Sequence, residues 1–200
     1  IGMSEMLDVI FGGKFWDNEK IYNAALNMLS FMRGYTDKQA EKYNLNFSLL
    51  ATSGELISGR FVEIDQTKFK SDIFKKGFYT NSFHVEVDSK IPAWEKIEKE
   101  GKFHAYCNGG CISYVELAEA PIGNPQGLDE LVEINAGVHY LGFNYPKDVC
   151  AECGTSGTFD ICPVCNSSHI TRIRRVSGYL EIQDYFTSGK KHEAKTRKAN

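Results

Sequence analysis

Two closely spaced pairs of cysteines constrain the fold of this chain more than any other feature. The stretches CAEC and CPVC supply Cys150, Cys153, Cys162 and Cys165, with eight residues between the two pairs. Each pair can present two thiolates to one cation, and two pairs complete the tetrahedral sulfur shell that Zn²⁺ accepts. Gly154 and Asn166 follow the pairs, and both residue types tolerate the positive φ that such a turn requires. The spacing therefore predicts a structural zinc site in a small four-cysteine ribbon.

The CPVC pair alone also fits a redox dithiol, which is the alternative interpretation. A redox motif of this kind is expected beside a βαβ unit, and the sequence around Cys162 does not predict one. The spacing of the four cysteines does not match the ferredoxin-type cluster patterns. Four protein ligands fill a zinc shell and leave no open position, so the expected role of the metal is structural.

Composition argues against several other classes of protein. The 200 residues carry a formal net charge of −3, which does not suit a protein that mainly coats nucleic acid. No apolar run approaches the roughly 20 residues of a membrane span, and the first residues lack the features of a signal peptide. We therefore expect a cytoplasmic protein, in a reducing compartment where cysteines serve as metal ligands or free thiols.

Hydrophobic spacing predicts helices that alternate with strands. We expect helices over 17–32 (stopped by Gly34), 37–43, 94–100 and 128–138 (stopped near Gly137). We expect strands or extended segments over 47–51, 60–65, 78–88, 111–117 and 139–145. Such alternation favours an α/β layout. The basic tail over 189–200 is expected to be a solvated or frayed end.

The stretch RVSGYL, at residues 175–180, raises the question of whether Gly178 only makes a turn. Removal of a hydrogen atom from a glycine Cα leaves a planar radical that is shared between the amide nitrogen and the carbonyl. A side chain would clash in that planar form and would cover the hydrogen, so glycine suits this chemistry best. From these six residues alone, an ordinary turn is the simpler interpretation.

Several motifs, in the same order along the chain, are similar to those of one enzyme family. RRVSGYL resembles the loop of glycyl radical enzymes, and a four-cysteine site just before it resembles the anaerobic (class III) ribonucleoside-triphosphate reductases. The upstream stretches KKGFYTNSFHVEVD, YCNGGCISYVEL and VHYLGFNYPKDVCAECG resemble three strand motifs of that family. The resemblance spans about residues 49–180, and the sequence is identified as a member of this family.

The resemblance implies a fold and an activity. The implied fold is the C-terminal part of a ten-stranded α/β barrel with a small four-cysteine zinc ribbon and a glycyl-radical loop. Residues 1–146 would belong to the barrel, 147–170 to the ribbon, and 171–200 to the loop and basic tail. Gly178 would carry the radical, and the enzyme would reduce ribonucleoside triphosphates to 2′-deoxyribonucleotides for DNA synthesis without oxygen.

The resemblance also implies partners. A radical S-adenosylmethionine activase would install the glycyl radical, which passes to a cysteine whose thiyl form abstracts the 3′-hydrogen of a ribonucleoside triphosphate. That cysteine lies several hundred residues before the glycine in this family, whereas 177 residues precede Gly178 here. We therefore expect the N-terminal barrel part on the same chain or on a split subunit, and no activity without it. The complete enzyme is expected to be a homodimer with no membrane association.

Other candidate site residues carry weaker signals. Three polar residues in the YTNSFH stretch are candidate substrate contacts, or else buried groups bonded to the backbone: Asn81, Ser82 and His84. Cys107 and Cys111 are either a thiol pair that accepts electrons from a dithiol protein or small buried hydrophobic residues. We favour the second interpretation of the two cysteines.

The loop over 51–60 departs from the family pattern. Ser53 stands where the family usually has a proline, so substrate contacts are not transferred to Thr52 or Glu55. Two further functions remain as alternatives: a non-catalytic zinc-ribbon docking module, and a repair protein that supplies a fresh glycine loop to an oxygen-cleaved enzyme. The intact RVSGYL stretch argues against the first, and the length of the chain argues against the second.

Overall fold

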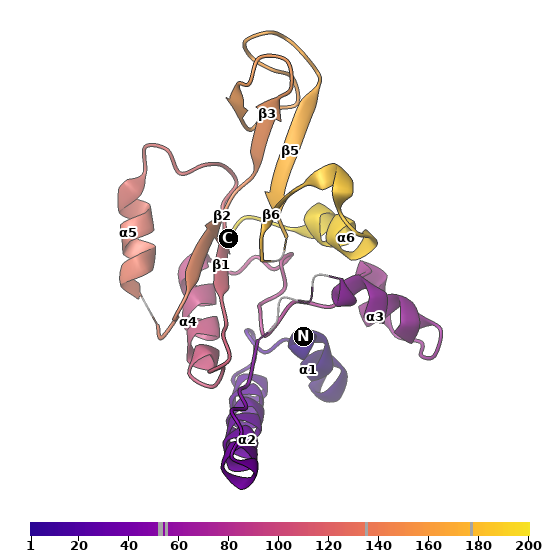
Figure 1. Cartoon of the computed structure of the whole chain (residues 1–200), viewed down its shortest axis with the longest axis vertical. Coiled ribbons are helices and arrows are strands. Elements are labelled where there is room, and N and C mark those ends of the chain that lie inside the picture. Colours follow the sequence, from indigo (N-terminus) through magenta and orange to yellow (C-terminus); the bar gives the residue numbers. More distant parts are fainter. Residues whose placement is uncertain (52–53, 55, 135, 177) are drawn as a thin grey trace.

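The computed structural model describes residues 1–51, 54, 56–134, 136–176 and 178–200. Helices and strands are mixed along the chain, and α2 and the β3–β5 ribbon project from opposite ends of the molecule (Figure 1). The elements are α1 (Met3–Phe11), α2 (Glu19–Tyr43), α3 (Ile57–Gln66), η1 (Asp72–Lys76), α4 (Ala93–His104), β1 (Ser113–Glu116), α5 (Pro125–Ile134), β2 (Leu141–Asn144), β3 (Lys147–Cys150), β4 (Ser156–Gly157), β5 (Ile170–Arg175), β6 (Leu180–Ile182), η2 (Gln183–Tyr185) and α6 (Ser188–Thr196). No helix in these ranges has both the length and the apolar character needed to cross a bilayer.

The strands form two small sheets. β1 and β2 are parallel, with Ser113 opposite Leu141 and Glu116 opposite Asn144. A parallel pair needs a crossover connection, which here contains α5. The second sheet is antiparallel, in the order β4-β3-β5-β6, and forms the projecting ribbon (Figure 1). The predicted mixture of helix and strand is therefore confirmed.

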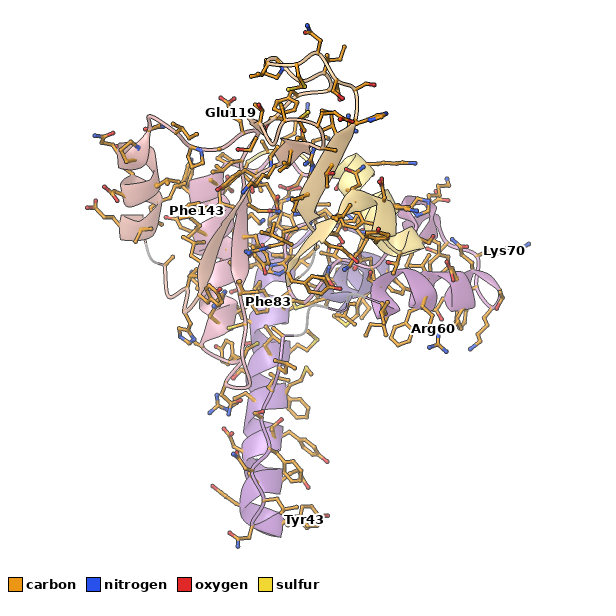
Figure 2. All side chains as sticks on the ribbon, turned by 45° about the horizontal axis from the view of Figure 1, so that its top comes forward. Tyr43, Arg60, Lys70, Phe83, Glu119 and Phe143 are labelled. Atoms are coloured by element: carbon orange, nitrogen blue, oxygen red, sulfur yellow. The ribbon has the colours of Figure 1, made fainter. Side chains whose placement is uncertain are left out.

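The apolar core lies where α1, α2 and α4 meet the segment around Phe83 (Figure 2). Phe15 and Phe103 are completely buried, and their ring centroids lie 5.6 Å apart in an edge-on arrangement. The ring of Phe103 also packs against the rings of Phe83 and Tyr22, with centroid distances of 5.4 Å and 5.3 Å. Burial of such aromatic side chains dominates core energetics, so this cluster fixes α2 against α4, which in turn packs on β1.

α2 is longer than the sequence predicts. The predicted stop at Gly34 is wrong, because the helix runs through it to Tyr43 and includes the separate helix expected over 37–43. A glycine inside a helix costs only about 1 kcal/mol relative to alanine, which a helix of this length tolerates. The helix ends instead at Asn44, whose φ of 50° lies in the left-handed region.

Two segments that were predicted to be extended are not regular strands. Residues 60–65 lie in α3, which packs on α6. The two helices approach so closely that a Cβ added to Gly59 would stand 2.7 Å from Gly189 Cα. This contact joins two segments that lie far apart in the sequence. Residues 47–51 form only an isolated bridge, between Leu50 and Gly110.

The segment 78–88 forms turns in place of the predicted strand, and its burial alternates only in part: Phe83 and Val85 are buried, whereas Val87 is half-buried. Its backbone is bonded by side chains, because Thr80 N donates to Glu5 Oε1 at 2.8 Å and Val85 N donates to Glu100 Oε1 at 2.9 Å. The expected helix over 94–100 and the expected strands over 111–117 and 139–145 are confirmed as α4, β1 and β2.

The tail over 189–200 is not a frayed end. Most of it is α6, in which Lys190 and Glu193 are buried. Beyond the helix, Lys198 N donates to Val87 O at 2.8 Å and Asn200 N donates to Glu116 O at 2.8 Å. The prediction of a solvated tail is wrong because these partners lie about a hundred residues earlier in the chain.

Candidate zinc ribbon and glycine loop

The two cysteine pairs form the same local turn. In the first, Gly154 N donates to Cys150 O at 3.0 Å, and in the second, Asn166 N donates to Cys162 O at 3.0 Å. Gly154 and Asn166 have φ values of 75° and 56°, as their positions after the pairs predict. Each turn thus leaves the two sulfur atoms of its pair on the same side of the backbone.

The four sulfur atoms come together in one cluster. They lie within 4.8 Å of one another, with Sγ–Sγ distances of 3.5 Å for Cys150–Cys165 and for Cys153–Cys162. A zinc tetrahedron with its usual Zn–S bonds has edges of about 3.8 Å. Backbone N–H groups of Cys165 and Val164 lower the pKa of Cys162 to about 6, which favours its thiolate. The donor set and its spacing therefore fit a tetrahedral zinc ion.

β5 connects this cluster directly to the loop that contains Gly178. Cys150 lies opposite Ile170 at one end of β5, and Arg175 lies opposite Leu180 at the other. The strand spans about 17 Å between these ends at the usual rise per residue. Arg174 and Asp148 form an ion pair at 2.7 Å that joins β5 to β3.

Gly178 lies at the exposed turn between β5 and β6. Its φ is 60°, in the left-handed region where glycine has no steric penalty. The backbone of Arg175 and Val176 before it is tightly bonded, whereas Gly178 itself faces outward. The geometry therefore accounts for a glycine at this position as a turn residue and also presents its Cα at the surface of this chain.

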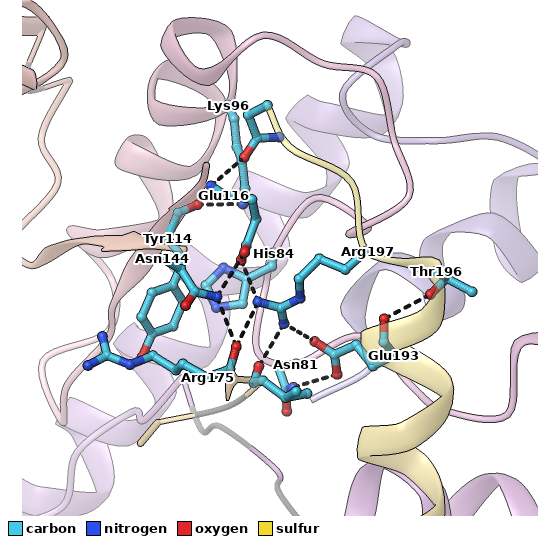
Figure 3. Close-up of polar contacts among 12 residues, drawn as sticks. Asn81, His84, Lys96, Tyr114, Glu116, Asn144, Arg175, Glu193, Thr196 and Arg197 are labelled. Atoms are coloured by element: carbon cyan, nitrogen blue, oxygen red, sulfur yellow. Dashed lines mark hydrogen bonds and ion pairs between the residues drawn. The ribbon is translucent and has the colours of Figure 1, made fainter. Parts of the chain in front are cut away.

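Arg197 and three polar side chains around it hold the base of this loop (Figure 3). Arg197 Nη1 donates to Glu116 Oε1 at 2.6 Å and Nη2 donates to Glu193 Oε1 at 2.5 Å. Asn144 Nδ2 donates to Glu116 Oε2 at 2.8 Å and to Arg175 O at 2.9 Å. Burial raises the pKa of Glu193 above its ordinary value, although Arg197 acts in the opposite direction.

The candidate substrate residues lie close to this base. Asn81 Nδ2 is 3.4 Å from Glu193 Oε2, and the buried Asn81 Oδ1 and Ser82 Oγ have no hydrogen-bond partner within the described ranges. Asn81 and His84 line a cavity of about 20 Å³ together with Arg197. That volume accommodates about one water molecule, so the cavity is too small for a nucleotide.

His84 belongs to a buried ionic group on α4. Its Nδ1 lies 3.1 Å from Glu100 Oε2, and Glu100 is completely buried. Burial opposes ionisation of Glu100, but the charges of Lys96 and His84 prevail and lower its pKa to about 2. An ionised Glu100 accepts a hydrogen bond from His84 Nδ1, and His84 also lines the small cavity.

Cys107 and Cys111 have the environment of packed side chains. Cys107 is buried, and burial raises its pKa to about 11. Burial also raises the pKa of Cys111, whose Sγ lies 3.9 Å from Cys107 O. Thiols with raised pKa values are poor nucleophiles near neutral pH, which supports the buried hydrophobic interpretation.

His104, Cys111 and His139 form a second group with ligand atoms within 4.8 Å of one another. His104 uses both ring nitrogens, because Nδ1 accepts from His139 N at 3.1 Å and Nε2 donates to Ser113 Oγ at 2.9 Å. Burial lowers the pKa of His104 to about 4, which favours this neutral form. The arrangement therefore fits a satisfied core histidine better than a metal site.

Comparison with known proteins identifies the family. The family model described as anaerobic ribonucleoside-triphosphate reductase matches residues 1–199. The chain belongs to this family. The reductase of Escherichia coli (strain K12) is 34% identical over 98% of the chain and 30% of its own length. The reductase of Enterobacteria phage T4 is 35% identical over 76% of the chain and 27% of its own length. The chain thus spans about 30% of the length of its curated relatives.

Solved anaerobic ribonucleotide reductases share the fold. One has a TM-score of 0.78 and 23% identity, and the match covers 92% of this chain and 29% of that one. The enzyme from Thermotoga maritima, crystallised with dATP and CTP, has a TM-score of 0.69 and 21% identity over 90% of this chain and 29% of its own. The mixed helix and strand arrangement with its cysteine cluster is therefore that of anaerobic ribonucleotide reductases.

Sequence reasoning missed the residues at the base of the loop in this anaerobic reductase family member. Glu116 and Asn144 end the two parallel strands, and polar residues at such carboxyl ends are a usable signal. Arg197 gave no signal, because it lies in a basic stretch that resembles a solvated tail. Thr52, Ser53 and Glu55, in the loop that departs from the family pattern, lie outside the described residues.

Proposed function

We propose that this chain is the radical-bearing C-terminal part of an anaerobic ribonucleoside-triphosphate reductase. The complete enzyme reduces ribonucleoside triphosphates to 2′-deoxyribonucleoside triphosphates for DNA synthesis, and Gly178 carries the radical. One observation supports this most directly: in a chain of this family, a single strand, β5, connects the four-cysteine cluster to the loop with Gly178.

The proposed radical step moves one hydrogen atom at a time. The activase, a radical S-adenosylmethionine enzyme with an iron–sulfur cluster, takes a hydrogen atom from Gly178 Cα and leaves the glycyl radical. Gly178 then regains a hydrogen atom from a cysteine thiol in the remaining part of the enzyme, which leaves a thiyl radical. The thiyl abstracts the 3′-hydrogen of the substrate, the 2′-hydroxyl group leaves as water, and formate or a dithiol protein supplies the two reducing electrons.

The proposed architecture assigns residues 1–146 to a ten-stranded barrel, 147–170 to the zinc ribbon, and 171–200 to the loop and tail. β1 and β2, with α5 in their crossover, are two parallel strands of that barrel. The remaining strands come from an N-terminal part, on the same chain or on a split subunit, and the complete enzyme is a homodimer. The chain spans about 30% of its relatives, which agrees with a substantial missing part.

The proposed cation is a structural zinc held by the four clustered cysteines. In this role the metal supplies no chemistry to the substrate and keeps β3 and β5 in register at the far end of the ribbon. Asn81, Ser82 and His84 are proposed substrate-side residues, because they lie close to the loop base and the buried Asn81 Oδ1 and Ser82 Oγ have no hydrogen-bond partner among the described residues. Cys107 and Cys111 are proposed as packed thiols without a redox role, because burial raises their pKa values.

The test is an electron paramagnetic resonance measurement on the complete enzyme, purified without oxygen and treated with the activase. We expect a doublet from the Cα hydrogen of a glycyl radical, its loss in air, and cleavage of the chain at Gly178. The Gly178→Ala variant should bind zinc and give no doublet. An activated wild-type enzyme with bound zinc, no doublet and an intact chain in air would refute the proposal.

A further inference from the structure

We propose that Arg197 is a positioning residue for the glycine loop. It would act on the stem carbonyls, which we define as the backbone carbonyl groups of Arg175 and Val176. This inference rests on the proposed radical role of Gly178. It assigns a mechanical function to the C-terminal segment, which the sequence predicts to be a solvated tail.

The guanidinium of Arg197 reaches both stem carbonyls at once. Nη1 donates to Arg175 O at 3.1 Å, and Nη2 donates to Val176 O at 2.8 Å. Asn144 Nδ2 adds a second donor to Arg175 O at 2.9 Å. These contacts hold the last residue of β5 and the first residue of the loop, and they end before Gly178 itself.

Two carboxylates fix the guanidinium from opposite elements. Glu116 ends β1 and pairs with Nη1 at 2.6 Å, while Glu193 lies on α6 and pairs with Nη2 at 2.5 Å. Each terminal nitrogen therefore serves one carboxylate and one stem carbonyl. Arginine suits this geometry because its donors form a rigid planar fork, whereas a lysine ammonium is a single point on a flexible stem.

The backbone around Arg197 is held on both sides. Arg197 N donates to Glu193 O at 3.0 Å at the end of α6. On the other side, Lys198 N donates to Val87 O at 2.8 Å, and Asn200 brackets Glu116 through its backbone N–H and side-chain oxygen. A group anchored in this way transmits the position of β1 and α6 to the stem of the loop.

Hydrogen-atom transfer from a cysteine to Gly178 requires close and well-oriented approach of the two groups. A displacement of 1 Å by a change outside the reacting atoms can reduce such a step about 100-fold. The contacts of Arg197 end before Gly178. Loss of Arg197 should therefore change the position of the glycyl radical more than the yield with which the radical is installed.

The experiment uses the complete enzyme, activated without oxygen, and measures two quantities. Spins per protein report installation of the radical, and deoxynucleotide formed per spin reports its transfer. For Arg197→Lys we expect bound zinc and a doublet, with product per spin lowered at least about 10-fold. Arg197→Ala should recover part of its product per spin when guanidinium ion is added at millimolar concentration.

The matched control is Arg33→Lys on α2. Arg33 Nε forms a partly exposed pair with Asp37 at 2.9 Å on a helix that projects away from the loop, so product per spin should not change. If Arg197→Lys loses zinc or fails to fold, the Asn144→Ala variant is the deciding test. We expect this variant to form several-fold less deoxynucleotide per spin than the wild type. Wild-type product per spin in the deciding variant would overturn the inference, whereas absence of a doublet in the wild type would refute the proposed function.

Discussion

Gly59 of α3 and Gly189 of α6 pack backbone against backbone. A Cβ built on Gly59 would stand 2.7 Å from Gly189 Cα, and one built on Gly189 would stand 2.8 Å from Gly59 Cα. Atoms of two backbones cannot yield as the end of a flexible side chain can. This contact brings α6, and with it Glu193 and Arg197, to the base of the glycine loop.

Gly59→Ala should therefore separate α3 from α6 and destabilise the chain by about 1–3 kcal/mol, the usual cost of an overpacked contact. Thermal or urea unfolding, followed by circular dichroism, measures the difference. Gly34→Ala is the matched control, because Gly34 is inside α2 with nothing within 4 Å of the added Cβ. It should stabilise the chain by up to about 1 kcal/mol. Equal effects of the two variants would contradict the proposed contact.

Removal of one cysteine ligand should abolish stoichiometric zinc binding. For Cys162→Ser we expect loss of the metal and rapid proteolysis within 150–170, because the ribbon has little apolar core of its own. Metal analysis and limited proteolysis measure both effects. Cys111→Ser, which alters a thiol outside the cluster, should retain one zinc per chain. Zinc bound equally by both variants would contradict the four-cysteine site.

Acid should destabilise the chain partly through His104. Its folded pKa is lowered to about 4 from an ordinary value of 6.5, so the unfolded state binds the proton more tightly. Its stabilising contribution is full above pH 6.5 and is lost as the pH falls toward 4, by at most about 3 kcal/mol. In the His104→Gln variant, the free energy of unfolding should change less between pH 6.5 and pH 4 than it does in the wild type. An unchanged pH profile in the variant would show that His104 does not titrate in this way.

A second acid effect is expected at lower pH. The pKa of Glu100 is lowered from 4.5 to about 2, so its contribution is present above pH 4.5 and is lost as the pH falls through that interval. Glu100→Gln should be less stable than the wild type at pH 7, and the two proteins should converge near pH 2. Parallel unfolding curves of wild type and variant from pH 7 to pH 2 would argue against an ionised Glu100.

Cleavage at Gly178 in air should leave the C-terminal fragment bound. The fragment keeps the ion pair of Arg197 with Glu116 and the backbone contacts of Lys198 and Asn200. We expect the two pieces to elute together in native size-exclusion chromatography and to separate in denaturant. Arg197→Lys should release the fragment more readily, because one of its anchors is weakened. Immediate release from the wild type would show that these contacts are too weak to hold it.

The sequence predicts the parts of the molecule whose causes are local. The positive φ after each cysteine pair follows from Gly154 and Asn166, and amphipathic spacing predicts α4 near its observed position. α3 was not predicted as a helix, and its close contact with Gly189, which lies 130 residues away from Gly59 (189 − 59), leaves no local signal in the sequence.

The candidate site also combines residues marked by local motifs with residues that meet only in the folded chain. The four cysteines and Gly178 are marked by short motifs, whereas the role of Arg197 depends on two strand ends and a helix that meet only in the folded chain. The turns over 78–88 were missed for a similar reason. In this segment the backbone N–H groups donate to the carboxylates of Glu5 and Glu100, where a strand would bond to the backbone of a neighbouring strand. No local sequence pattern indicates these carboxylate partners.

β5 has the cysteine cluster at one end and the glycine loop at the other. A rotation of the ribbon about one of these ends therefore displaces the other end. Over its length of about 17 Å, a tilt of about 3° moves the far end by about 1 Å. A disturbance at the cysteine cluster would therefore displace the glycine loop even while every strand remains paired. Partial loss of the proposed zinc should misalign this loop well before the protein unfolds.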